Sequence, residues 1–248
     1  MSVYAPLLTE LDYWQAAGLT ADFWLRDDDA ADTSAALDKL LGCTTSAGIN
    51  PVVASVPRLA TADLAACLSE HPGIVVWQHG VSHTNNSLPP AKKQELTRAD
   101  NGTIEALRAA RNRACDLFGT QMQPVLVPPW NRINPELVHR LPEAGFEGIS
   151  TFRPRSCRAA ARGVWQVNTH IDIIDWRSGR SLVSVSHLFQ RIAGNLRAKR
   201  TGVADPLEPT GILTHHNVME EAAWAFLSDL FALTNSHTAA RWCVPNGE

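Results

Sequence analysis

The chain has 248 residues, 45% hydrophobic and 19% charged, with a formal net charge of -3. This composition is ordinary for a globular protein and lacks the basic footprint of a nucleic-acid-binding protein, and the apolar runs are too short to cross a bilayer. Five dispersed cysteines predict reduced thiols rather than a cysteine zinc site. The N-terminus shows no signal-peptide pattern, so we expect one cytoplasmic domain, residues 1–248, with no nucleic-acid or membrane partner.

Predicted helices and strands alternate along the chain. Strand-like apolar segments occupy residues 23–25, 52–56, 73–79, 124–129, 146–151, 164–171 and 211–214. Helical periodicity occupies residues 5–18, 33–47, 61–70, 89–119, 135–144, 181–199 and 219–233. Residues 153–162, RPRSCRAAAR, are predicted as a loop, either solvated or binding a phosphate. Alternation of this kind indicates an α/β fold with parallel strands joined by helices, either a barrel or a doubly wound sheet.

Three aspartates follow the first predicted strand. Phe23, Trp24 and Leu25 are typical of a buried strand, and residues 27–29 come directly after it. Adjacent carboxylates repel one another, so they need a cation, an arginine or solvent beside them. Two interpretations remain open from these residues alone. They form either a solvated acidic loop that caps the next helix, or a charged site.

A pair of histidines follows the third predicted strand. Val75, Val76 and Trp77 end in His79, and His83 comes four residues later. Side chains at positions i and i+4 share one face of a helical turn, and two neutral imidazoles placed in this way can bind one metal ion. The alternative is that both histidines only satisfy local hydrogen bonds.

The positions of polar residues favour the barrel. Active sites in α/β barrels gather at the C-terminal ends of many strands, whereas a doubly wound sheet concentrates its ligands at one switch point. Polar clusters occur at the ends of at least five predicted strands: residues 27–29, His79 with His83, Trp130 with Asn131, Asp172 with Asp175, and His215.

Together these clusters resemble the motifs of the polysaccharide deacetylase family, the NodB-homology carbohydrate esterases, over residues 20–217. The five motifs occur in the family's order: Asp28-Asp29, His79 to His83, Pro128-Pro129-Trp130, Asp172 to Trp176, and Leu213 to His215. The resemblance implies an irregular seven-stranded (β/α) barrel. It also implies a metal-dependent hydrolase that acts on carbon–nitrogen bonds other than peptide bonds.

The resemblance implies a role for each motif residue. Asp29, His79 and His83 are expected to bind a divalent metal ion, leaving positions open for water and substrate as catalytic zinc sites do. The ligand types suit zinc and also tolerate cobalt, nickel, manganese or iron. Asp28 is implied as the general base and His215 as the general acid.

The remaining motif residues are expected around these groups. Asp175 is expected to orient His215 and favour its protonated form. Trp130, Asn131 and Trp176 are expected to bind substrate, and the alternative for the tryptophans is a packing role in the core or at the rim.

Two family positions carry different residues in this chain. Gly80 follows the first histidine where the family has serine or threonine, and Ser82 is a partial substitute. Val127 stands where the family has the arginine that pairs with the catalytic aspartate, so Arg26 or Arg132 is a candidate for that role.

Two assignments have a rival in a neighbouring residue. The register Asp27-Asp28 competes with Asp28-Asp29 for the family's aspartate pair, and His216 competes with His215. Ala30 favours the register Asp28-Asp29, because a small residue follows the pair in the family.

The predicted function is removal of an acetyl or other acyl group from an N-acetylated (or O-acetylated) sugar or glycan, with a small molecule or oligosaccharide as substrate. The absence of a secretion pattern favours an intracellular glycan or glycoconjugate. Two alternatives remain: an amidase acting on a non-sugar C–N bond with the same barrel, and a non-catalytic carbohydrate-binding protein.

Overall fold

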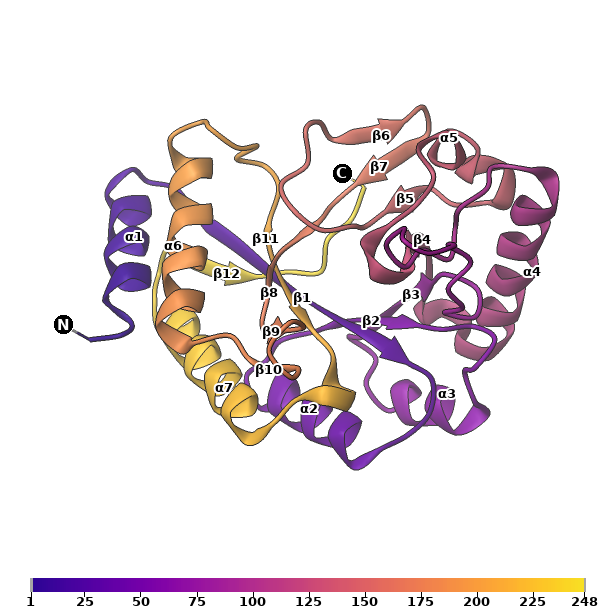
Figure 1. Cartoon of the computed structure of the whole chain (residues 1–248). Helices are drawn as coiled ribbons and strands as arrows, with labels where there is room; N and C mark the ends of the chain where they lie inside the picture. The colour runs from indigo at the N-terminus through magenta and orange to yellow at the C-terminus, as the bar shows by residue number, and fades with distance from the viewer. Residues whose placement is uncertain (1, 248) are drawn as a thin grey trace.

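A mostly parallel β-sheet forms the centre of the molecule, and helices lie around its outer side (Figure 1). The computed structural model describes residues 2–247. Hydrogen-bonded neighbours follow the order β6-β7-β5-β4-β3-β2-β1-β11-β8, and β12 pairs with the start of β1. The strands of this sheet are β1 (Ala21–Ala30), β2 (Val52–Ser55), β3 (Val75–His79), β4 (Met122–Val127), β5 (Gly148–Ile149), β6 (Ala159–Ala161), β7 (Val164–Gln166), β8 (Thr169–Asp172), β11 (Thr210–Thr214) and β12 (Ala240–Trp242).

Two consecutive strands join the ends of the sheet into a barrel. β7 pairs with β5, and β8 pairs with β11 at the other end of the strand order. Between them, Val167 N donates to Ile149 O at 3.2 Å and Thr169 N donates to Thr151 O at 3.1 Å. When β7 and β8 are counted as one strand position, the barrel has seven positions, as predicted: β1, β2, β3, β4, β5, β7–β8 and β11.

Most helices lie where the sequence predicts them, and side chains cap the first turns of α2 and α3. Ser34 Oγ accepts from Leu37 N at 3.1 Å, and Thr61 Oγ1 accepts from Leu64 N at 3.1 Å, which satisfies amides that have no partner inside a helix. The helices are α1 (Ala5–Ala16), α2 (Ala35–Ser46), α3 (Ala62–Ser69), α4 (Asn101–Phe118), α5 (Pro135–Val138), α6 (Val185–Arg200) and α7 (Glu221–Asn235).

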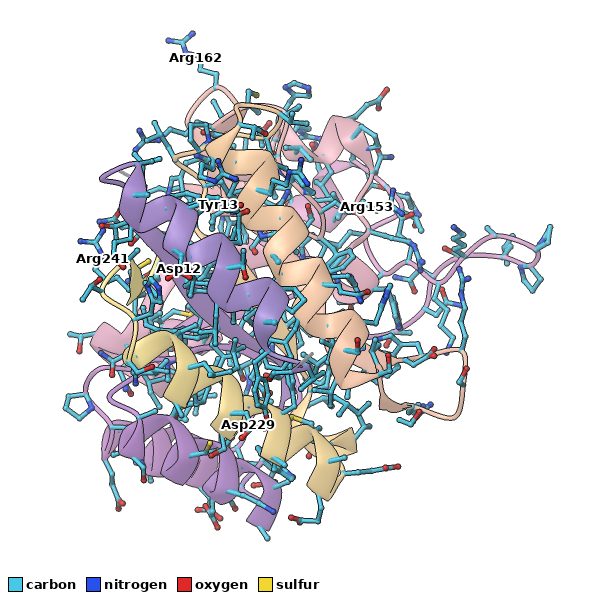
Figure 2. All side chains as sticks on the ribbon, turned by 90° about the vertical axis from the view of Figure 1, so that its left-hand side faces the viewer. Asp12, Tyr13, Arg153, Arg162, Asp229 and Arg241 are labelled. Carbon is cyan, nitrogen blue, oxygen red and sulfur yellow. The ribbon has the colours of Figure 1, made fainter. Side chains whose placement is uncertain are left out.

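Helices α1 and α6 lie side by side on the outside of the barrel, with Asp12 and Tyr13 labelled on α1 in Figure 2. The guanidinium of Arg200, at the end of α6, lies 5.0 Å from the ring centre of Tyr13. No helix within residues 2–247 is long and apolar enough to cross a membrane.

Side chains of β1 alternate between the two sides of the barrel wall, as a strand requires. Phe23 and Leu25 belong to the core between sheet and helices, whereas Trp24 belongs to the inner cluster, 5.4 Å from the ring of Trp77. The same alternation carries Arg26 to the inner side, where it bonds to residues across the barrel.

One long predicted helix is wrong over its first third. Residues 89–119 have the composition of a helix, but α4 begins only at Asn101, where Asp100 Oδ1 accepts from Thr103 N at 2.9 Å. The preceding residues are irregular. They contain Pro89 and Pro90, and their carbonyls accept from Asn86 and Asn134 in neighbouring segments instead of from the next helical turn.

Four smaller predictions also differ from the structure. β1 runs on through residues 27–29 to Ala30, and 164–171 is interrupted between β7 and β8. The predicted loop at 153–162 contributes β6, which pairs with β7 as an antiparallel hairpin. Residues 135–144 form the short helix α5 and a 3-10 turn, Leu141–Ala144, rather than one helix.

A buried charge network lies at the N-terminal end of the barrel. Lys199 Nζ donates to Glu208 O at 2.6 Å and to Thr210 Oγ1 at 3.0 Å. Glu208 Oε2 lies 3.1 Å from His170 Nε2. Burial lowers the pKa of Lys199 to about 7, and the nearby carboxylates oppose this only in part.

This lowered pKa predicts that stability rises with pH above neutrality. Between about 7 in the folded state and about 10.4 in the unfolded state, the unfolded chain binds more protons, so raising the pH favours folding. From pH 7 to pH 10 we expect the free energy of unfolding to rise by on the order of 3 kcal/mol relative to Lys199→Met. Urea unfolding at several pH values measures this, and parallel pH curves for the two proteins would contradict it.

Candidate functional site

The site begins at a bulge near the end of β1. The pairing of β1 with β2 shifts register between Asp27 and Ala30, and Asp29 has a φ of 72°. A positive φ is costly for an aspartate and persists where surrounding structure enforces it. The bulge turns the Asp29 carboxylate out of the regular alternation and toward the end of β3.

The structure brings Asp29, His79 and His83 together. His79 is the last residue of β3, and His83 lies in the following loop with a φ of 57°. Asp29 Oδ1 lies 3.0 Å from His79 Nε2 and 3.1 Å from His83 Nε2, and the three ligand atoms lie within 4.8 Å of one another.

The geometry of this group fits a metal ion. Asp29 Oδ1 is buried and makes no well-aligned hydrogen bond, although both imidazole nitrogens are close to it. Ligand atoms around a four-coordinate zinc ion lie about 3.3 Å apart, similar to the separations here. The three atoms therefore converge on a common point instead of forming a hydrogen-bonded chain.

A backbone carbonyl fixes the proton of His79. Its Nδ1 lies 3.0 Å from Val127 O, which can only accept, so Nδ1 donates and Nε2 keeps its lone pair. A hydrogen bond of this kind orients imidazole ligands in metal sites. Val127 thus supports the site through its main chain, at the position where the family has arginine.

The charges of the site shift the pKa values of its groups. Burial raises the pKa of Asp29, but the adjoining imidazoles of His79 and His83 outweigh burial and hold it well below the usual range. Burial lowers the pKa of His83, and Asp29 outweighs this and raises it. Asp29 is therefore ionised, as a metal ligand must be.

Arg26 binds Asp28 inside the barrel. Arg26 Nε and Nη2 donate to the two carboxylate oxygens of Asp28 at 2.8 and 2.9 Å, and both side chains are buried. The guanidinium also donates to Ser150 Oγ at 2.7 Å and to Asn131 Oδ1 at 2.8 Å. Of the two candidates for the missing arginine, Arg26 therefore contacts the aspartate, whereas Arg132 donates to Lys93 O.

Asp27 and His216 form a separate buried pair on the outer side of β1. His216 Nδ1 contacts Asp27 Oδ1, and Asp27 Oδ2 accepts from His216 N at 3.0 Å and from Thr214 Oγ1 at 2.7 Å. Both side chains are buried. Asp27 is thus bonded to β11 and the residues after it, whereas the candidate metal cluster contains Asp29.

His215 lies at the same rim, directly after β11. Its ring lies 4.7 Å from that of Trp176 in an edge-on arrangement, and its Nδ1 is buried without a hydrogen-bond partner. Asp172 is the adjacent carboxylate: burial raises the pKa of Asp172, and the charge of His215 opposes this. Trp176 Nε1 donates to Asp172 Oδ2 at 2.8 Å.

Asp175 lies away from His215, contrary to our expectation that it orients this ring. Its Oδ1 accepts from Arg177 N at 3.0 Å and Ser178 N at 3.2 Å, in the turn between β9 (Ile174–Asp175) and β10 (Ser181–Leu182). Within residues 2–247 no hydrogen bond or ion pair joins Asp175 to His215.

The predicted substrate residues surround the histidines. Trp130 lies 4.5 Å from the ring of His83, and Trp176 is 44% exposed beside His215. Trp130 and Asn131 both have a φ of 55°, so strained backbone occurs at four site residues together with Asp29 and His83. Asn131 Oδ1 accepts a hydrogen bond from Arg26, so Asn131 helps to hold the guanidinium that binds Asp28.

Two contributors were not singled out in the sequence. Asp172 belongs to the fourth motif, and only the three-dimensional path of 172–176 distinguishes it from Asp175. Glu95 lies outside all five motifs, and its carboxylate bonds to the loop that carries His83. The sequence signal that could have pointed to Glu95 was Gly80, which lacks a side chain at a position where the family has a serine or threonine.

Comparison with known proteins shows the fold. The chain matches no known sequence-family model and no curated protein sequence. A family 4 carbohydrate esterase from Streptococcus mutans is 14% identical, with a TM-score of 0.61 over 93% of this chain and 93% of that chain. The peptidoglycan N-acetylglucosamine deacetylase Bc1960 is 16% identical, with a TM-score of 0.55 over 90% and 86%.

A third solved structure, a family 4 acetyl xylan esterase from Clostridium thermocellum in complex with a cobalt ion, is 16% identical, with a TM-score of 0.52 over 90% and 87%. The chain therefore has the fold of the polysaccharide deacetylases and family 4 carbohydrate esterases. This confirms, at the level of the fold, the resemblance inferred from the five motifs.

The Arg26 contacts predict a large loss of stability for Arg26→Met. The substitution leaves the Asp28 carboxylate buried without its partner, which costs about 3 kcal/mol in the free energy of unfolding. Arg132→Met, the matched control, should cost less than about 1 kcal/mol because Arg132 makes one bond to a backbone carbonyl.

Urea unfolding measures both variants. The double variant Arg26→Met/Asp28→Asn should lose less stability than the two single variants lose in sum, because it no longer has an unpaired buried charge. Additive losses, or an Arg26→Met as stable as the control, would contradict the assignment of Arg26.

Proposed function

We propose that this protein is a metal-dependent deacylase that removes an acetyl group from an N-acetylated sugar or glycan. The observation that carries the proposal is the convergence of Asp29, His79 and His83, with Asp28 and His215 at the same rim of a deacetylase-like barrel. Amide hydrolysis needs an activated water, a polarised carbonyl, a base and an acid, and this rim offers a residue for each.

A divalent ion held by Asp29 Oδ1, His79 Nε2 and His83 Nε2 supplies Lewis acidity to the acyl oxygen and to the attacking water. Three protein ligands match the donor set of catalytic zinc sites. Zinc is our first choice, and the cobalt ion in the Clostridium thermocellum esterase supports a borderline metal in this fold.

Asp28 takes the proton from the attacking water. Both of its oxygens accept from Arg26, and each keeps a second lone pair for a proton. The bidentate contact fixes the carboxylate plane and holds Asp28 beside its neighbour Asp29. The position of the base is therefore set by a buried guanidinium on the same strand.

His215 gives a proton to the departing amine. Asp172, rather than Asp175, is the carboxylate near His215, because its Oδ2 accepts from Nε1 of Trp176, whose ring lies against His215. Trp130 and Trp176 stand next to His83 and His215, where they can bind the apolar faces of a sugar.

The direct test is acetate release from N-acetylglucosamine oligomers, paired with elemental analysis before and after chelation. We expect about one metal ion per chain and activity that is lost on chelation and restored by zinc. Bound metal without acetate release would favour another acyl group or a non-sugar amide. Sugar binding without metal or turnover would contradict the proposal and favour a carbohydrate-binding protein.

Asp28→Asn should separate catalysis from metal binding. Removing the base lowers the turnover rate at least about 100-fold, while the metal content stays that of the wild type. Asp38→Asn, an exposed position on α2, is the matched control and should keep full activity. An active Asp28→Asn would show that the base assignment is wrong.

His79→Ala should release the metal. The variant loses one of three ligands, so its metal content after dialysis falls well below that of the wild type. His139→Ala, at an exposed histidine after α5, should remain loaded. A fully loaded His79→Ala would mean that the ligand set is wrong.

A further inference from the structure

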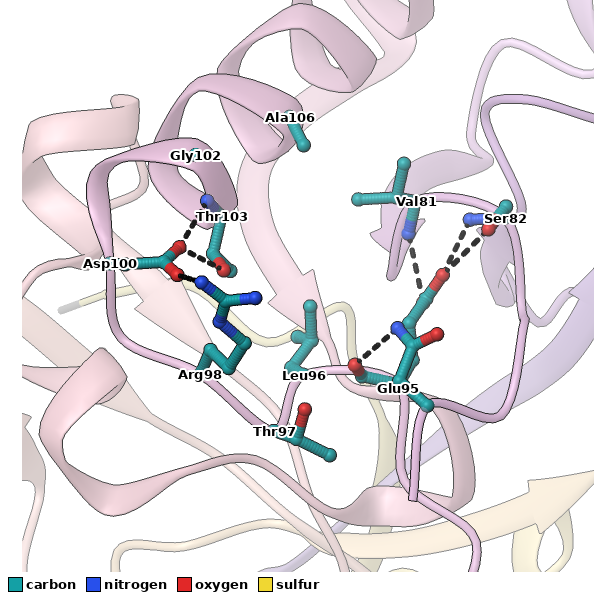
Figure 3. Close-up of a pocket in the computed structure, with 11 residues that line it drawn as sticks. Val81, Ser82, Glu95, Leu96, Thr97, Arg98, Asp100, Gly102, Thr103 and Ala106 are labelled. Carbon is teal, nitrogen blue, oxygen red and sulfur yellow. Dashed lines mark hydrogen bonds and ion pairs between the residues drawn. The ribbon is translucent and has the colours of Figure 1, made fainter. Parts of the chain in front are cut away.

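Glu95 is a buried acidic residue with no role in the five motifs. It lies in the irregular segment before α4, and only 5% of its surface is exposed. Its carboxylate points at residues 80–84, which we call the histidine loop because it connects His79 to His83 (Figure 3). A buried carboxylate without an ionic partner needs several hydrogen-bond donors to offset its desolvation.

The histidine loop supplies these donors. Glu95 Oε2 accepts from Val81 N at 3.0 Å, and Glu95 Oε1 accepts from Ser82 N at 2.8 Å and from Ser82 Oγ at 2.9 Å. Thr84 N is a more distant donor to Oε1 at 3.4 Å. The donors come from both sides of the turn that leads into His83, so the contacts fix the backbone of that turn.

The absence of a side chain at Gly80 is matched to Glu95. A Cβ at Gly80 would lie 2.0 Å from Glu95 Oε2 and 2.6 Å from Pro129 Cδ, so another residue fits only if both Glu95 and Pro129 move. Gly80 also has a φ of 61°, which glycine adopts at little cost. Glu95 and Pro129 therefore occupy the space that a side chain at position 80 would need.

Glu95 is itself held in place by its main chain. Its carbonyl accepts from Asn86 Nδ2 at 2.8 Å and from Thr97 N at 3.1 Å. The next residue, Leu96, is buried and pairs with Ile133 in a bridge. The carboxylate thus extends from an anchored segment and not from a free loop.

We propose that Glu95 is a positioning residue of the metal centre, which holds the histidine loop so that His83 Nε2 stays beside Asp29 Oδ1. This rests on the metal site of the proposed function. Residues that support ligands in this way typically change metal affinity about 10-fold to 100-fold when replaced.

The test is zinc affinity, measured by competition with a chelating dye. In Glu95→Gln, an amide NH2 replaces one acceptor and faces backbone N–H groups, so we expect zinc to bind at least about 10-fold more weakly. The visible absorption of the cobalt-loaded variant should also differ from that of the wild type, because these bands depend on ligand geometry.

Asp100→Asn is the matched control. Asp100 and Glu95 both line a pocket of about 540 Å³ (Figure 3). Asp100 caps α4, and within residues 2–247 it makes no hydrogen bond or ion pair with the histidine loop. Asparagine caps helices as well as aspartate does, so this variant should keep wild-type affinity and spectrum. Circular dichroism before metal addition shows whether each variant is folded.

Ser82→Ala provides a second, milder variant if Glu95→Gln does not fold. It removes one hydrogen bond to Glu95 and should weaken zinc binding about threefold. Wild-type affinity and an unchanged cobalt spectrum in a folded Glu95→Gln would overturn the positioning role. Failure of the wild type to bind zinc or cobalt would instead overturn the proposed function, so the two failures are distinguishable.

Discussion

Three adjacent carboxylates on one strand repel one another, and the site depends on how this repulsion is compensated. Each aspartate has a different partner from a different direction. Asp27 turns outward to His216, Asp28 turns inward to Arg26, and the bulge turns Asp29 sideways to two histidines. Because no two aspartates share a partner, β1 can remain a strand through all three positions.

Because their partners differ, the carboxylates of Asp28 and Asp29 also differ in what they can bind. The Asp28 carboxylate is bound at both oxygens by a guanidinium and is therefore fixed in plane, whereas Asp29 Oδ1 lacks an aligned donor. A carboxylate with an unsatisfied buried oxygen attracts a cation, and a carboxylate already paired with a cation does not. This difference between two identical side chains is why we propose Asp28 as the base and Asp29 as the metal ligand.

Supporting contacts accompany the two positions that depart from the family pattern, Gly80 and Val127. Arg26 supplies the guanidinium that is absent at Val127, and the Val127 carbonyl orients His79. Glu95 fills the space that Gly80 leaves open. At each of these two positions the structure thus places a supporting contact beside Asp28, His79 or the histidine loop.

Much of this arrangement could be predicted from the sequence, and the failures have physical causes. Hydrophobic runs ending in polar residues indicated the barrel, since parallel strands collect their C-terminal ends at one rim. The sequence left Arg26 and Arg132 as two candidate partners of Asp28 and could not choose between them, because an arginine two residues away faces the same side only if the strand stays regular.

Long-range contacts account for the remaining differences. Residues 89–100 have the composition of a helix, yet Glu95 in their middle bonds to the histidine loop, and propensity does not describe such a tertiary contact. Asp172 and Asp175 are both aspartates and lie three residues apart, so the sequence does not rank them. Only the turn that contains Asp175 decides which of them lies beside His215.

The most direct measurement is anomalous X-ray diffraction from zinc-loaded crystals, at energies on both sides of the zinc absorption edge. The account predicts one strong peak about 2.1 Å from Asp29 Oδ1, His79 Nε2 and His83 Nε2, with Asp28 still bound to Arg26. A peak bound by other residues, or none at this cluster in crystals soaked with excess zinc, would contradict the assignment of the metal centre.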